Sequence, residues 1–310
     1  MEFFKKRAAK KAAKEQVEEA VKAADERVAK KRAAKIDEAL EQAIEKQEAD
    51  NPSEETLSPE TESSQETIEA LREVLADDPD KRIHVTAQTT VASVYSILKD
   101  ETGIRVEDAL GVIGAFAGHM SIRAAMNVSS VDDEARLTVL GLSNDETAIC
   151  GPAIYDFLIG NPHSVFNLVG GGVQQAGGTN MPDPNLLVQT HVRTIGTENY
   201  GIPVVPEDNR LRDTPRNFLI QLWPLLESHI TVFDKAPDAL CAAMGVAAQD
   251  VIIQAKDAIN PELAAQIVMQ SAFATSSIPP AIARKAMDEA TKAREKMQAS
   301  QNPNEPSTSS

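Results

Sequence analysis

The sequence predicts a mostly α-helical protein whose compact multi-helix core carries one small β-hairpin. Two observations predict this class. Aromatic residues make up only 4% of a chain that is 42% hydrophobic, so the core has to be built from Ala, Val, Ile and Leu, and we expect such a core to be helical. Apolar side chains also recur at spacings of three and four residues through most of residues 67–278, as they do on one face of a helix.

Composition divides the chain into four predicted parts. Residues 1–47 nearly lack Gly and Pro and are rich in Ala, Lys and Glu, which predicts a long charged helix. Residues 48–66 are rich in Pro, Ser, Glu and Thr and predict a disordered linker, because such a segment buries too little apolar surface to offset its ordering entropy. A helical core domain is expected over 67–278, and a C-terminal helix with a disordered tail over 279–310.

The predicted N-terminal helix offers three alternative roles. A seam of apolar side chains with heptad spacing begins at Val17 and resumes at Ile36 after a one-residue phase slip, which suits a weak coiled coil. The same pattern also suits a lone charged helix. Phe3, Phe4 and the basic residues within positions 1–14 add the alternative of a peripheral contact with an anionic membrane.

Within the core, helix after helix follows from periodicity and capping residues. The stretch 105–126 is apolar nearly all round and contains several glycines, so it is predicted to be the central buried helix. The stretches 236–259 and 260–274 place an acidic residue after a proline in the first turn, which suits a helix N-terminus. The other helices are expected over residues 67–76, 86–103, 165–176, 183–196 and 214–230.

One β-hairpin is expected between the central helix and the glycine-rich stretch. Leu137 and Val139 alternate with polar residues, and a second apolar run covers Thr147 to Cys150. The turn formers Ser143, Asn144 and Asp145 join the two runs, as in a hairpin.

The run "NLVGGGVQQAGGTNMP", residues 167–182, imitates a phosphate-binding loop. The P-loop pattern needs a lysine where Gly178 stands, and the dinucleotide pattern needs a glycine where Gln175 stands. Ser164 is an N-cap and Gly177 a C-terminal stop for a helix over 165–176. The three consecutive glycines inside it would cost about 1 kcal/mol each relative to Ala, so we expect a neighbouring helix to approach closely there.

Three blocks of the core, "GVIGAFAG", "VFNLVGGGVQQAGG" and "ELAAQIVMQSA", resemble the helical blocks of an uncharacterised bacterial protein family whose members keep small-residue helices in this order. The resemblance covers roughly residues 80 to 280. It implies a helical core and implies no activity, cofactor or site.

Charge and cysteine content limit the classes of partner. The net charge is -16, and residues 67–278 hold twice as many acidic as basic residues. No nucleic acid is therefore expected at the core, because phosphate contacts need clustered Lys and Arg. Cys150 and Cys241 form neither a disulfide framework nor a metal-binding spacing, and both are expected to be buried thiols. The chain lacks the apolar region of a signal peptide near its start, so we expect a soluble, cytoplasmic protein.

The best concentration of polar candidates for a site runs from residue 191 to residue 213. It contains His191, Arg193, Glu198 and Tyr200, and Pro/Gly-rich loops of this kind often hold binding groups on a rigid scaffold. His163, just ahead of the glycine-rich helix, is the second candidate, either as a capping group or as part of a site. An ordinary surface connection pinned by salt bridges is the alternative. The histidines show no metal-binding spacing, so neither a metal nor a cofactor is expected, and no catalytic residue is identified.

Two functions are consistent with these patterns. The first is a non-enzymatic, self-associating interaction or scaffold protein, a homo-oligomer that meets a protein partner through its N-terminal helix. The alternative is a small-molecule-binding domain or an enzyme with its site near His163 and the 191–213 loop.

Overall fold

The computed structural model describes residues 68–129, 136–142 and 147–301. The predicted N-terminal helix, the linker and the C-terminal tail beyond residue 301 lie outside the described residues, as does the turn of the predicted hairpin. From residue 72 onward the described residues belong to one compact unit.

The protein is mostly α-helical with one small antiparallel hairpin, so the predicted fold class is confirmed. Residues 68–75 are helical. The elements that follow are α3 (Pro79–Leu98), α4 (Val106–Val128), β1 (Thr138–Gly141), β2 (Thr147–Cys150), α5 (Pro152–Tyr155), the π-helix η1 (Asp156–Gly160), α6 (Val165–Gln175), α7 (Pro184–Thr194), the 3-10 helix η2 (Glu207–Asn209), α8 (Pro215–Ile230), α9 (Pro237–Gln254), α10 (Pro261–Ser276) and α11 (Pro280–Gln301).

Proline opens most of the helices from α3 to α11. A proline in the first turn sacrifices no hydrogen bond, because the N–H groups there have no partner within the helix. At α3 the Asp78 side chain caps the helix by accepting from the N–H of Lys81 at 3.1 Å, and Pro79 follows. The helix therefore begins seven residues before the expected start at Thr86 and ends at Leu98 rather than Gly103. The expectation placed the start too late because it relied on apolar periodicity rather than on the cap.

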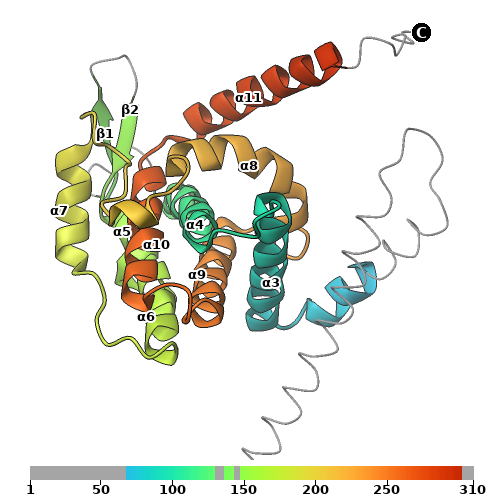
Figure 1. The fold of residues 1–310 in the computed structure, drawn as a ribbon, viewed down its shortest axis with the longest axis horizontal. Helices are drawn as coiled ribbons and strands as arrows, with labels where there is room; N and C mark the ends of the chain where they lie inside the picture. Colours follow the sequence, from blue (N-terminus) through green and yellow to red (C-terminus); the bar gives the residue numbers. More distant parts are fainter. Residues whose placement is uncertain (1–67, 130–135, 143–146, 302–310) are drawn as a thin grey trace, which may run out of the picture. The chain divides into compact units, whose positions relative to one another are not determined.

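Helix α4 is the centre of the core, as predicted, with α3, α8, α9 and α10 around it in Figure 1. Almost every residue from Asp108 to Ala125 is buried. Among the described residues α4 is the one helix long and apolar enough to cross a bilayer, judged by length and composition alone, and 89% of its most apolar window is buried within the protein. Its apolar surface is therefore covered by its own neighbours.

Glycine brings α4 and α10 unusually close together. A Cβ added to Gly114 would lie 2.5 Å from the carbonyl oxygen of Val268, and one added to Gly118 would also collide with the α10 backbone. Across the same contact Thr275 donates its hydroxyl to the carbonyl oxygen of Ala115 at 2.7 Å. This part of the core has no room for even one additional methyl group.

The glycine-rich run forms helix α6, as predicted. The Ser164 hydroxyl caps it by accepting from the N–H of Asn167 at 3.4 Å, and Gly177 follows the helix with a φ of +90°. The expected close approach by a neighbouring helix occurs at Gly172, where a Cβ would lie 3.0 Å from the Cα of Gln249 on α9. At Gly171 the nearest atom would be 3.7 Å away, so the three glycines are not equivalent.

The remaining elements cover the edges of the core. Strands β1 and β2 pair antiparallel, with Val139 opposite Ile149, and the N–H of Ile149 donates to the carbonyl oxygen of Ser277 at 2.9 Å just beyond α10. Helix α11 contacts α8, and α7 lies beside α10 at the left of the view in Figure 1.

Candidate functional site

A cavity of about 980 Å³ lies between α7, the loop 195–206 and α10. Small-molecule sites in proteins typically enclose about 300–1,000 Å³ and are lined mainly by apolar side chains. This cavity has such a lining, and its volume is at the upper end of that range. It is therefore the part of the described structure best suited to hold a ligand.

The wall of the cavity is apolar at depth. Leu187 of α7 and Phe273 of α10 are 8% and 3% exposed, and both belong to the main hydrophobic core. Nearer the solvent, Leu186, Ile202 and Val204 also line the cavity and are 58%, 54% and 70% exposed. The cavity thus continues outward into an apolar rim.

Two glutamines of α10 hold the loop against the helix. The side chain of Gln270 accepts from the N–H of Val204 at 2.5 Å, and that of Gln266 donates to the carbonyl oxygen of Val204 at 2.8 Å. Earlier in the loop, the Tyr200 hydroxyl donates to the carbonyl oxygen of Ala274 at 3.0 Å. Gly201, with a φ of +75°, allows the turn between these attachments. These contacts preform the wall of the cavity opposite α7.

A carboxylate is held at the start of α10. Glu262 lines the cavity, and its Oε1 accepts from the N–H groups of Thr179 at 3.1 Å and Asn180 at 2.9 Å. These backbone hydrogen bonds lower the pKa of Glu262. The side chain of Asn260 caps the helix by accepting from the N–H of Glu262 at 2.8 Å. Glu262 is consequently ionised at neutral pH and has a defined position.

His191 is the most deeply buried polar side chain in the cavity wall. It is 5% exposed, and its ring packs against Phe273, Tyr200 and Tyr155 with centroids 5.4, 6.1 and 6.4 Å away. Burial lowers the pKa of His191 to about 4, so the imidazole is neutral at pH 7. Its Nε2 is buried and has no hydrogen-bond partner in the structure.

A second polar atom without a partner lies beside that ring. Tyr155, at the junction of α5 and the π-helix η1, buries its hydroxyl with no hydrogen-bond partner, and burial raises the pKa of Tyr155. Buried polar groups in proteins are nearly always hydrogen-bonded. Six buried polar atoms without a partner occur in the described residues, among them His119 Nδ1 and the Ser271 hydroxyl, and the two near the cavity belong to neighbouring rings.

The structure brings together only part of the predicted site. His191 lines the cavity. Tyr200 packs against the ring of His191 and anchors the loop to α10. His163, Arg193 and Glu198 are exposed and are not among the residues that line the cavity. The expected role of His163 as a helix cap is also wrong, because Ser164 supplies that hydrogen bond.

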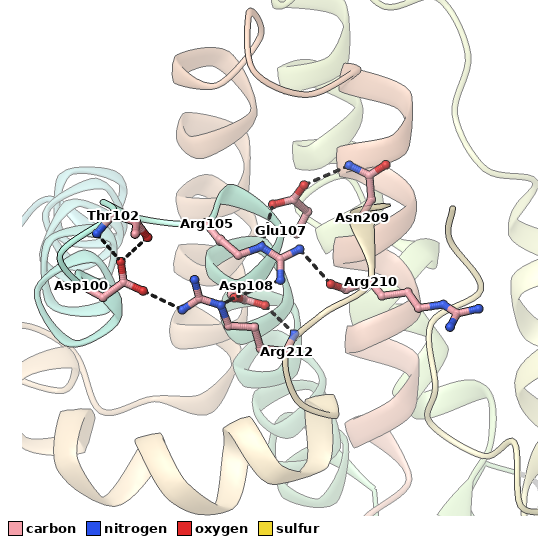
Figure 2. A network of polar contacts seen from close by, with 8 residues as sticks. All are labelled: Asp100, Thr102, Arg105, Glu107, Asp108, Asn209, Arg210 and Arg212. Atoms are coloured by element: carbon pink, nitrogen blue, oxygen red, sulfur yellow. Dashed lines mark hydrogen bonds and ion pairs between the residues drawn. The ribbon is translucent and has the colours of Figure 1, made fainter. Parts of the chain in front are cut away.

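The predicted 191–213 stretch serves two different places. Several residues from His191 to Val204 line the cavity, whereas residues 209–212 reach the start of α4 (Figure 2). There the N–H of Arg212 donates to the buried Asp108 at 2.9 Å, and Arg105 donates to the carbonyl oxygen of Arg210 at 2.9 Å. The second half of the stretch is thus a connection pinned to the core, as in the alternative of a surface connection.

The same network includes an exposed carboxylate at the end of α3. Asp100 accepts from the hydroxyl of Thr102 and from Arg212, the latter at 2.9 Å (Figure 2). These hydrogen bonds, that of Thr102 first, lower the pKa of Asp100 to about 2. Every charged group in this network faces an opposite charge or a hydrogen-bond partner, so the network positions the loop rather than a ligand.

The sequence interpretation missed the wall contributed by α10. It assigned 260–274 to a core helix and used the acidic residue after Pro261 only as a sign of the helix N-terminus, and it gave no site role to Glu262, Gln266, Gln270 or Phe273. The spacing of Gln266 and Gln270, four residues apart on one face of an otherwise apolar helix, was the available signal, because side chains at that spacing are neighbours on the helix surface.

The two cysteines differ in burial. Cys241 is buried as expected and its thiol faces the carbonyl oxygen of Ala117 at 3.7 Å, whereas Cys150 is only partly buried. Within residues 68–129, 136–142 and 147–301, no three His, Cys, Asp or Glu side chains gather in a way that could hold a metal ion.

Comparisons of the chain with protein-family models, with curated proteins and with solved structures find no match. The resemblance to a bacterial family therefore stays a prediction, and any function has to be argued from the cavity itself.

Proposed function

We propose that this protein is a non-enzymatic binding protein for a small, mainly apolar molecule, which it holds in the cavity between α7, the loop 195–206 and α10. The observation that carries the proposal is the cavity itself, about 980 Å³ in volume with Leu187, Leu263 and Phe273 in its wall. Burying apolar surface contributes about 25 cal/mol per Å², so a ligand that fills such a space gains affinity without needing many polar contacts.

The anchoring of the loop supports a binding role. Gln266 and Gln270 clamp Val204, so the wall exists before a ligand arrives and little ordering entropy opposes binding. The charged candidates Arg193 and Glu198 point to no reaction here, since neither lines the cavity. We therefore favour binding over catalysis.

Filling the cavity tests the proposal. Nile red, an uncharged dye that fluoresces in apolar surroundings, should bind the full-length protein saturably. Thr190, which is exposed and lines the cavity, can be replaced by Trp, and Thr190→Trp should weaken binding about tenfold or more because the indole occupies the space. Gln189→Trp is the matched control, since Gln189 is exposed on the same helix but does not line the cavity. Equal loss in both variants, or no dye binding by the wild type, would count against a ligand site here.

A protein-docking function is the second candidate, and the exposed apolar rim favours it. Leu186, Ile202 and Val204 project large apolar side chains around the mouth of the cavity, and contiguous exposed apolar patches often mark interaction surfaces. The expected self-association would then use this rim. Sedimentation of the full chain tests it: association at micromolar concentration should weaken in an Ile202→Ser, Val204→Ser variant, and a strict monomer would remove this candidate.

A further inference from the structure

We propose that the cavity selects apolar molecules that carry a positively charged amine over those that carry a carboxylate or a phosphate. This inference rests on the proposed binding function and adds the charge of the ligand. The first supporting observation is the charge of the wall. Among the described residues that line the cavity, the side chains charged at neutral pH are the carboxylates Asp183 and Glu262, and none is Lys or Arg.

Glu262 is suited to receive an ammonium group. Within the described structure all its hydrogen bonds go to Oε1, from Thr179 and Asn180. Oε2 therefore keeps its capacity to accept hydrogen bonds, and a carboxylate has about four acceptor positions in all. Because two backbone N–H groups and two side chains hold Oε1, the carboxylate is held in place and needs no rearrangement to meet a cation.

The interior of the wall, where His191 lies, is also without positive charge. A buried imidazole that stays neutral at pH 7 supplies no positive charge to offset a ligand carboxylate, and burying an unpaired anion is strongly unfavourable. Its Nε2 is buried and has no partner in the protein, and the wall gains no charge from it. His191 therefore leaves Asp183 and Glu262 as the charges of the wall at neutral pH.

The amide side chains of the wall fit the same class of ligand. Asn180 and Asn199 line the cavity, and their carbonyl oxygens can accept from an amine. A cleft whose fixed charges share one sign also attracts ligands of the opposite charge from solution. The apolar surface supplies the affinity and the carboxylates supply the selection.

Three probes with the same decyl chain test the inference on the full-length protein at pH 7: decylamine, which is protonated, 1-decanol, which is neutral, and decanoate, which is an anion. Calorimetric titration, or displacement of Nile red, gives a Kd for each. We expect decylamine to bind about tenfold or more tightly than decanoate, with decanol between them. If decanoate binds as tightly as decylamine, the charge inference is wrong while the binding function stands. If none of the three binds, the proposed function itself fails.

Two substitutions locate the source of the selection. Glu262→Gln keeps an oxygen for the N–H groups of Thr179 and Asn180 but removes the charge, so decylamine affinity should fall about threefold while decanol affinity is unchanged. Glu198→Gln, an exposed change on the loop 195–206 that does not line the cavity, is the control and should alter neither. Thr190→Lys should reverse the order and favour decanoate. An unchanged preference for decylamine in both Glu262→Gln and Thr190→Lys would overturn the inference, and melting temperatures verify that each variant is folded.

Discussion

The two faces of α10 differ in how closely they meet their neighbours. One face packs on α4 so tightly that a Cβ on Gly114 or Gly118 would collide with the α10 backbone. The other face carries Gln266, Gln270 and Phe273 and borders a cavity of about 980 Å³. A single helix therefore belongs both to the most tightly packed contact of the core and to the wall of the proposed site. Substitutions on the first face should act on stability, and those on the second should act on binding.

The largest effect is expected from Gly118→Ala. The new methyl group would collide with Ala272 and Thr275 of α10, and overpacking of this kind typically costs about 1–3 kcal/mol and occasionally more. We expect the free energy of unfolding to fall by about 3 kcal/mol, measured by urea denaturation.

Gly171→Ala is the matched control for that substitution. A Cβ at Gly171 would have no neighbour closer than 3.7 Å, and Ala is favoured over Gly in a helix by about 1 kcal/mol. This variant should be as stable as the wild type or up to about 1 kcal/mol more stable. Similar losses at both positions would show that the α4–α10 contact is no tighter than the rest of the core.

The next largest effect should come from pH, and it compares a histidine of the core with one of the cavity. Burial lowers the pKa of His119 in α4 to about 3, with help from Arg123 and Arg284, and burial lowers the pKa of His191 to about 4, both from an ordinary value of 6.5. The unfolded chain therefore binds more protons than the folded chain below pH 6.5. Stability from these groups is present above that pH and is lost as pH falls toward 4.

Between pH 6.5 and pH 5 each buried histidine should reduce the free energy of unfolding by about 2 kcal/mol, since one pKa unit corresponds to about 1.4 kcal/mol. His119→Phe and His191→Phe should each remove that share of the pH dependence, measured by urea denaturation at pH 7 and pH 5. Saturation with Nile red should reduce the part of this pH-dependent loss of stability that is due to His191. The part that is due to His119 should stay the same. A pH dependence unchanged in His191→Phe would mean that this imidazole is not held neutral by burial.

The smallest effect on stability is expected at the second face of α10. Gln270→Ala removes the acceptor for the N–H of Val204, an exposed hydrogen bond, so the free energy of unfolding should fall by less than about 1 kcal/mol. The amide of Val204 should exchange with solvent faster, and Nile red should bind more weakly because the wall is less ordered. Gln189→Ala is the control on α7. If the Val204 amide exchanged faster but Nile red bound as tightly as before, the order of the loop would not matter for ligand binding.

Local signals were sufficient for most of the elements. The helix 165–176 followed from Ser164 and Gly177, and the burial of α4 followed from its uniform apolarity. The error at the start of α3 arose because Asp78 and Pro79, a cap and a first-turn proline, precede the first residues of the apolar pattern. These two local signals for a helix start were present in the sequence, but the prediction relied on apolar periodicity instead.

The candidate site was predictable only in part. His191 and Tyr200 lie nine residues apart, and their proximity follows from the short connection after α7. Glu262, Gln266 and Gln270 lie more than sixty residues further along the chain, and nothing in their local sequence indicates that α10 faces α7. The predicted 191–213 site was likewise divided by the contact of Arg212 with Asp108, which lies 104 residues earlier in the chain.

Within the described residues, the amino-acid sequence by itself determined most of the helical segments, though not α5 and η1, and which helix lies deepest, because caps, proline positions and apolar periodicity act within a few residues. Only the tertiary structure decided where backbones touch and where a space remains. Gly114 and Gly172 lack a side chain in the same way as Gly171, yet only the first two meet a neighbouring helix closely. Whether a missing side chain becomes a close contact or leaves free volume depends on how distant helices cross, and that geometry is set by the packing of all their side chains at once.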